Sequence, residues 1–137
     1  MAYTLENIEA ELDQAGVPYT DPAYAMITDL SGFFGSNRNI RYGGAAISER
    51  DTLLLTFNGL LSGNSIFELS PMGMTKLTVK KLLILPSYVA DIRGMADGKK
   101  YRFKVQLNTN VGGGGFPDQQ SNVMNIVNTL KKWESSL

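Results

Sequence analysis

The amino-terminal segment carries apolar residues at the spacing of a helix. In YTLENIEAELDQAG they recur at intervals of three and four, which predicts an amphipathic helix with Thr4 as its N-cap and Gly16 as its stop. The next segment, TDPAYAMITDLSG, places Asp21 as an N-cap and Pro22 at the first helical position. We therefore expect a second short helix that ends at Gly32.

From residue 38 onward the hydrophobic period changes from 3.6 to 2. Alternating apolar and polar residues, bounded by turn residues, predict six strands at 40–48, 52–58, 65–69, 74–80, 88–93 and 100–108. Residues 82–85 either extend one of these strands or form a seventh. Asp97-Gly98 is the strongest hairpin signal and joins the last two strands. Along the last strand one face is apolar, whereas the other is basic and faces solvent or a partner.

The carboxy-terminal segment PDQQSNVMNIVNTLKKWESSL predicts a helix, with Asp118 as its N-cap. Its broad apolar stripe consists of Val123, Ile126, Val127, Leu130 and Trp133. Such a stripe needs an apolar surface to cover, and a strongly bent antiparallel sheet with an open end provides one. We expect a single α+β domain, in which a helical arm (residues 1–37) precedes a partly open barrel closed by this helix (residues 38–137).

The composition excludes several kinds of chemistry. The 137-residue chain has neither cysteine nor histidine, so disulfides, thiolate metal sites and histidine bases are excluded. We expect no metal and no cofactor. Residues 1–37 contain no lysine or arginine, so the basic region of a signal peptide is missing, and no apolar run is long enough to span a bilayer. A cytoplasmic protein is the expectation.

The formal net charge of zero conceals an uneven distribution. Residues 1–37 carry six acids and no base, whereas the rest of the chain carries thirteen bases and seven acids. An acidic amino-terminal arm beside a basic body either steers partners or packs against the body and masks it.

Four stretches carry a resemblance to a known family. AAISERDTLLLTF looks like the first strand pair of bacterial pleckstrin-homology-like (PH-like, GRAM-like) domains, and SIFELSPMGMTKLTVKKLLILP looks like their middle strands. ADIRGMADGKKYRFKV resembles their basic hairpin, and NVMNIVNTLKKW resembles their closing helix. The resemblance covers about residues 40–134 and implies two near-orthogonal sheets of seven strands in all, with the helix in one end of the barrel.

The resemblance also implies a function. Family members mostly bind lipids, peptides or other proteins, and many bacterial ones oligomerise. Where members hold phosphoinositides, a basic motif lies on the first two strands, but here that region offers only Arg38, Arg41 and Arg50. We therefore expect a non-catalytic bacterial scaffolding or binding module that acts through an unknown protein partner and self-associates. The alternative is peripheral binding to anionic lipid or another polyanion. No nucleic-acid partner is expected.

The candidate binding residues lie in the densest basic region. If neighbouring strands place them on one sheet face, that face can hold phosphates or an acidic partner; the members of this set are Lys76, Lys80, Arg93, Lys100, Arg102 and Lys104. The plainer interpretation is a solvated outer face whose lysines deter edge-to-edge aggregation.

Two other features are weaker candidates. Phe33 and Phe34, between glycines, form either a hydrophobic patch for a partner or part of the core. The glycines at 112–115 lack a phosphate-binding pattern and read as a loop. No catalytic residue is assigned.

Overall fold

The computed structural model describes residues 4–31, 40–57, 66–83, 86–111 and 115–137. The described helices are α1 (Leu5–Leu12) and α2 (Gln119–Ser136), with short 3-10 turns η1 (Asp13–Ala15) and η2 (Pro71–Gly73). The described strands are β1 (Tyr19–Asp29), β2 (Ile40–Ser48), β3 (Leu53–Phe57), β4 (Ile66–Leu69), β5 (Met74–Lys81), β6 (Ser87–Ala96) and β7 (Lys99–Asn108).

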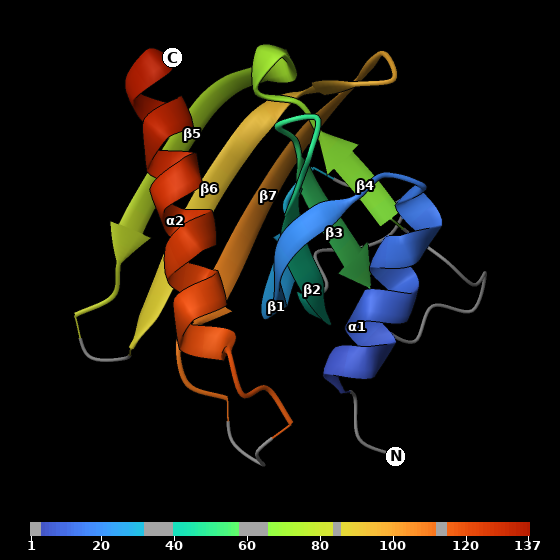
Figure 1. Ribbon diagram of the computed structural model, residues 1–137. Coiled ribbons are helices and arrows are strands. Elements are labelled where there is room, and N and C mark those ends of the chain that lie inside the picture. The colour runs from blue at the N-terminus through green and yellow to red at the C-terminus, as the bar shows by residue number, and fades with distance from the viewer. Residues whose placement is uncertain (1–3, 32–39, 58–65, 84–85, 112–114) are drawn as a thin grey trace.

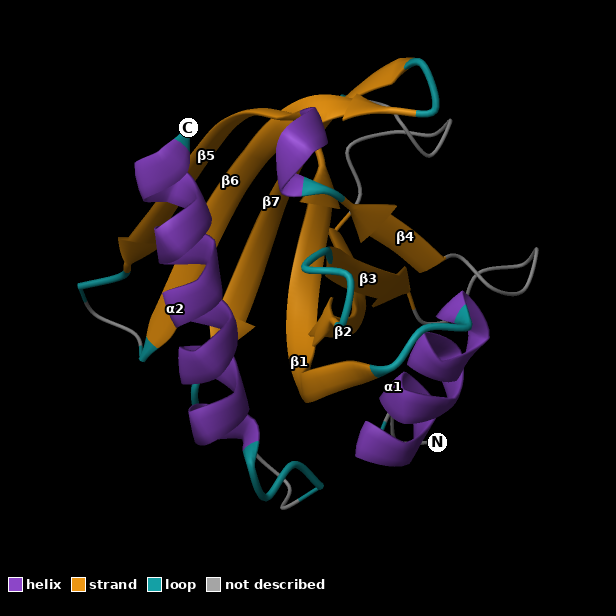
Figure 2. Cartoon of the chain, turned by 45° about the horizontal axis from the view of Figure 1, so that its top comes forward, coloured by secondary structure: helices purple, strands orange, loops and turns teal. Residues whose placement is uncertain are grey.

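All seven strands form one antiparallel sheet in the order β4-β3-β2-β1-β7-β6-β5. The sheet bends strongly, so that α2 lies against its inner face and α1 lies on the other half of the molecule (Figure 1). Figure 2 shows the same two halves from a second direction, with η2 between the sheet's two edge strands. In the described residues β4 and β5 do not pair with each other, so the sheet is open rather than closed.

The prediction of a second amino-terminal helix is wrong, because residues 19–29 form strand β1. Ala23, Ala25, Ile27 and Asp29 are buried in strict alternation, which is the period of a strand. The residues taken for a helix start lie instead at a bulge, where the register with β2 shifts between Thr20 and Ala23 and a proline is tolerated. The segment 1–37 therefore supplies a central strand as well as a helix.

The other predicted elements are confirmed. Each of the six expected strands is present within three residues of its expected bounds. Asp97 and Gly98 both have positive φ (52° and 76°), as a two-residue hairpin turn requires. Thr4 caps α1 in a capping box with Asn7. Asp118 holds the N-cap position of α2, but its side chain makes no capping hydrogen bond. Within 82–85, the described residues 82–83 lie outside the strands.

The core has two parts, one under each α-helix. The larger lies between the inner face of the sheet and α2, whose residues Val123, Ile126, Val127 and Leu130 are fully buried. The predicted apolar stripe is thus confirmed, with Trp133 partly buried at its end. The smaller lies under α1, where Ile8 and Leu12 pack on Ala46 of β2 and Leu54 of β3. The outer face of β5, β6 and β7 belongs to neither part.

Candidate functional site

The outer face of β5, β6 and β7 carries all six bases of the predicted set. Alternation along each strand turns every second side chain away from the core, and in β7 the inward residues are fully buried. The outward residues are Lys76, Thr78 and Lys80 of β5, Val89, Asp91, Arg93 and Met95 of β6, and Lys100, Arg102, Lys104 and Gln106 of β7. Six bases thus share this face with a single acid. We call it the basic face.

The register places three bases side by side across three strands. Lys76 of β5 lies directly opposite Arg93 of β6, and Arg93 lies directly opposite Arg102 of β7. Adjacent strands are about 4.8 Å apart, so this row of cations is about 10 Å long. Like charges directly opposite one another destabilise a sheet. The row Lys76–Arg93–Arg102 therefore has an energetic cost that a merely solvated face would avoid.

Among the residues that the structure describes, Asp91 is the one carboxylate that forms ion pairs with the row, and both arginines share it. Asp91 lies on β6 two residues before Arg93, on the same face. Its carboxylate accepts hydrogen bonds from Nε and Nη2 of Arg102 at 3.4 and 3.2 Å. The Nε of Arg93 lies 3.9 Å from the same carboxylate, which is an ion pair but too long for a hydrogen bond. That nitrogen is buried and has no acceptor in the described residues. The charge of Arg93 is thus only partly compensated.

Two hollows lie along the basic face. One, of about 550 Å³, is lined by Lys76, Lys80 and Lys104, with Met26, Thr28 and Ile40 of β1 and β2 on the other side. The other, of about 470 Å³, is lined by Arg93, Lys100 and Arg102, together with Thr75, Leu30 and Met95. Each predicted base therefore lines a hollow. The described residues contain no carboxylate within ion-pair distance of Lys76, Lys80, Lys100 or Lys104.

The sequence could not identify the walls that β1 and β2 contribute. The sequence predicts a helix over Met26 and Thr28, and a helix gives no reason to pair these residues with the basic strands. The register shows that Thr28 lies opposite Lys104, and Met26 opposite Gln106. The alternation of small buried residues from Ala23 to Asp29 is the signal that could have revealed this strand.

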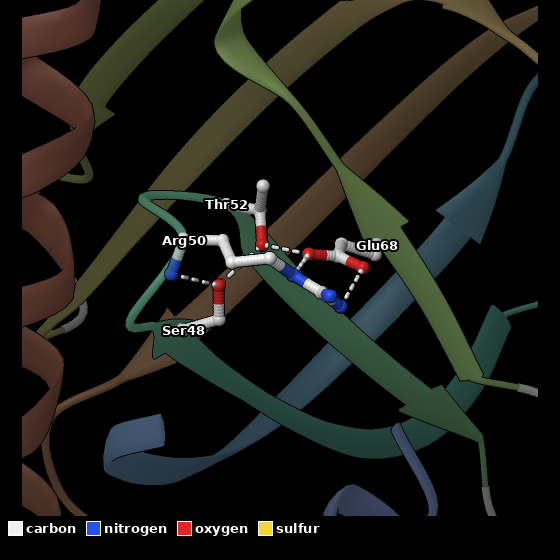
Figure 3. A network of polar contacts seen from close by, with 4 residues as sticks. All are labelled: Ser48, Arg50, Thr52 and Glu68. Carbon is white, nitrogen blue, oxygen red and sulfur yellow. Dashed lines mark hydrogen bonds and ion pairs between the residues drawn. The ribbon is translucent and has the colours of Figure 1, made fainter. Parts of the chain in front are cut away.

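A second polar network lies on the other half of the sheet and holds the β2–β3 turn to β4 (Figure 3). Arg50 forms a two-point ion pair with Glu68, at 3.0 Å from Nε and 2.7 Å from Nη2. Thr52 donates to Glu68 at 2.7 Å, so the Ser48 hydroxyl, 2.5 Å away, must donate to Thr52. Burial raises the pKa of Glu68, but the Thr52 hydrogen bond and Arg50 outweigh it, and the pKa is lowered. The ionised Glu68 thus links β4 to Arg50 and Thr52 at the β2–β3 turn, and we call these three residues the clasp.

Several other candidates can be placed. Phe33 and Phe34, the predicted hydrophobic patch, lie outside the described residues. On the described segment between β4 and β5, Met72 of η2 is exposed, whereas Met74 at the start of β5 belongs to the core. Burial raises the pKa of Tyr101 to about 12, so its hydroxyl remains protonated at neutral pH.

The described residues hold no group of three or more acids, histidines or cysteines placed to bind a metal ion. Among the described helices, none is long and apolar enough to cross a membrane.

Comparison of the chain with models of protein families, with curated proteins and with solved structures found no match.

Proposed function

We propose that this protein is a non-catalytic binding module that takes up an acidic surface of a protein partner on its basic face. The observation that carries the proposal is the row Lys76–Arg93–Arg102, in which like charges lie directly opposite one another on adjacent strands. An acidic partner supplies the countercharge that the sheet itself lacks. The exposed lysines around the row would steer such a partner and accelerate association at low ionic strength.

The test is the binding of a fluorescein-labelled decaglutamate peptide, followed by fluorescence anisotropy at 20 and 150 mM salt. We expect binding at low salt that weakens at the higher concentration, because exposed charges are screened. Lys80→Glu/Lys104→Glu reverses two charges in the larger hollow, and we expect it to weaken binding at least about tenfold.

Lys81→Glu/Lys132→Glu is the matched control, since it makes the same change in net charge elsewhere. Lys81 follows Lys80 on β5 but points to the opposite side of the sheet, and Lys132 is exposed on α2. We expect less than about a twofold effect at 150 mM salt, where the Debye length is about 8 Å. Equal losses in both variants, or no binding by the wild type at 20 mM salt, would reject the proposal.

One observation favours peripheral binding to anionic lipid as a second candidate. Met95 lies opposite Lys100 beside the β6–β7 turn, and its side chain is exposed. An apolar side chain next to bases at a hairpin tip suits a charged membrane surface. Sedimentation with phosphatidylserine vesicles tests this candidate, and we expect Met95→Ser and Lys100→Glu each to reduce it. Protein that stays in the supernatant at 20 mM salt argues against lipid binding.

We further propose that the fold is a partly open, PH-like barrel. The support is one antiparallel seven-stranded sheet followed by a helix that packs on its inner face. The two edge strands, β4 and β5, are consecutive and are joined through η2. A crystal structure in which the inner faces of the two halves of the sheet share no core would contradict this.

A further inference from the structure

The basic face carries more positive charge than its one carboxylate, Asp91, can balance. Resting on the function proposed above, we infer that the partner's anionic group is a phosphorylated side chain, bound by the row Lys76–Arg93–Arg102 together with Lys100. Lys100 lies on β7, two residues from Arg102 on the same face, and lines the smaller hollow with both arginines. These four residues form the proposed phosphate site.

The first argument is the supply of uncommitted donors. Asp91 occupies only Nε and Nη2 of Arg102, and the side chain of Arg93 donates no hydrogen bond within the described residues. The side chains of Arg93 and Arg102 are 41 % and 38 % exposed, so a ligand can reach them. Guanidinium groups present planar pairs of N–H donors that match the oxygens of a phosphate.

The second argument is the balance of charge. Four cations and one carboxylate leave an excess that a single carboxylate from a partner does not neutralise. A phosphate monoester carries close to two negative charges at neutral pH and three acceptor oxygens. It can therefore bind bases on neighbouring strands at once, whereas a glutamate has only two oxygens. The hollow of about 470 Å³, with Leu30 and Met95 in its wall, gives room for the apolar stem of a modified side chain.

The third argument favours a peptide over a lipid headgroup as the source. Lys76 lies on β5, an edge strand that pairs with β6 on one side and with no described strand on the other. The free backbone edge of such a strand can pair with an extended peptide. A peptide bound there would run beside Lys76, and its side chains could reach across to Arg93.

The experiment compares three fluorescein-labelled peptide pools that share degenerate flanking positions and differ only at the centre, which is phosphoserine, glutamate or serine. We expect the phosphoserine pool to bind at least about tenfold more tightly than the glutamate pool at 150 mM salt. Equal binding of the two pools would overturn this inference but leave the proposed function intact. Failure of both pools at 20 mM salt would reject both.

The pH dependence gives a second, independent readout. A phosphate monoester loses its second proton near pH 6, and the chain has no histidine. The groups facing the site are Lys76 and Lys80 of β5, Asp91 and Arg93 of β6, and Lys100, Arg102 and Lys104 of β7. None of these residue types ordinarily titrates between pH 5.5 and 7.5. Phosphoserine binding should therefore strengthen about threefold or more over that range, while glutamate binding stays constant. A flat phosphoserine profile would overturn the inference.

Single substitutions test which residues of the proposed phosphate site bind phosphoserine. Arg93→Gln should weaken phosphoserine binding about tenfold, and Arg93→Lys should lie between it and the wild type because the charge remains but the paired donors are lost. Asp91→Asn removes the competing carboxylate and should strengthen binding. The control Lys81→Gln lies on the opposite side of the same sheet and should have no effect. Thermal unfolding confirms that each variant is folded.

A vesicle arm separates the two sources of phosphate. Vesicles that contain a phosphatidylinositol phosphate should compete weakly with the phosphoserine pool. Tight binding to those vesicles, together with no preference for phosphoserine over glutamate, would show that the site serves a lipid and would overturn the inference. An unchanged affinity in Arg93→Gln would do the same.

Discussion

Gln119, the first residue of α2, closes a gap between two strands of the sheet. Its side chain accepts from Tyr24 N–H at 2.9 Å and donates to the carbonyls of Tyr24 and Asn108 at 3.0 and 2.9 Å. β1 pairs with β7 only from Met26 to Asp29. Where the two strands separate, the side-chain amide of Gln119 replaces the backbone hydrogen bonds between them. Because Gln119 is 4 % exposed, water does not reach these groups easily.

We predict that Gln119→Leu lowers the free energy of unfolding by about 3 kcal/mol, because it leaves three backbone groups unsatisfied in a buried position. Urea unfolding measures the change. Gln120→Leu is the matched control, since Gln120 is the exposed neighbour, and it should change stability by less than about 0.5 kcal/mol. Similar effects of the two substitutions would show that the amide does not bridge the strands.

At the scale of elements, the strands from β2 onward follow from the sequence because alternation and turn residues agree there. β1 does not, because Tyr24, Ile27 and Leu30 also fit a helical period, and a proline after Asp21 imitates a helix start. Two of the buried positions of β1 are the alanines Ala23 and Ala25, which lie in the core under α2. Alanine has the highest helix propensity, so these residues did not indicate a strand. Tertiary packing decided between two periods that the sequence allowed.

The docking of α1 depends on one glycine of β2. A Cβ on Gly44 would overlap Cγ2 of Ile8 and lie 3.1 and 3.2 Å from its Cγ1 and Cβ. We predict that Gly44→Ala pushes α1 away from the sheet and costs about 1–3 kcal/mol. Chemical denaturation of Gly44→Ala, Ile8→Ala and the double variant measures the coupling.

In that cycle the cost of Gly44→Ala should fall by about 1 kcal/mol or more when Ile8 is already alanine, since the contact is then relieved. Gly115→Ala is the control, because a Cβ there meets nothing within 4 Å. Strictly additive effects of the two substitutions would mean that α1 does not rest on Gly44.

The clasp formed by Arg50, Thr52 and Glu68 makes a further element-level prediction. The pKa of Glu68 is lowered in the folded protein, so its ionised form contributes stability above the unfolded pKa of about 4.3. That contribution is lost as the pH falls through the lower, folded value. At pH 7 we expect the free energy of unfolding of the wild type to exceed that of Glu68→Gln by less than about 1 kcal/mol. The gain is small because the Glu68 side chain is 32 % exposed and solvent screens its charge.

Below pH 4 the difference between wild type and Glu68→Gln should shrink, and urea unfolding from pH 7 to pH 3 measures it. Glu49→Gln, at an exposed position of the β2–β3 turn, is the control and should change the free energy of unfolding at pH 7 by less than Glu68→Gln does. A difference that persists unchanged at pH 3 would contradict the assignment of ionised Glu68 as the clasp.

At the scale of the whole molecule, the pattern of bases predicted the arrangement of the basic face only in part. The period of two put Lys100, Arg102 and Lys104 on one face, and this was readable from the sequence. That Lys76, Arg93 and Arg102 lie in one row was not, since register between strands depends on turns and on packing of the inner face. The bulge of β5 between Met74 and Lys76 is an example, because it sets which residue lies opposite Arg93.

The acids of α1 and the bases of the basic face occupy different regions, and this leads to a prediction about self-association. The acids of α1 lie on the helix that packs on β1, β2 and β3, whereas the bases of the basic face lie on β5, β6 and β7. A second copy therefore offers an acidic protein surface to the basic face. At 20 mM salt we expect a mass by light scattering of at least twice 15.0 kDa, and at 500 mM salt the monomer mass.

Charge reversal tests which surfaces meet. Glu6→Lys/Glu9→Lys and Lys80→Glu/Lys104→Glu should each reduce the mass at 20 mM salt, because like charges then face each other at the contact. A mixture of the two variants should regain it, since the lysines of one complement the glutamates of the other. Deletion of residues 1–37 is not a usable alternative, because it removes the central strand β1. A monomer at 20 mM salt, or a mixture that stays monomeric, would show that the acidic surface of α1 and the basic face do not bind each other.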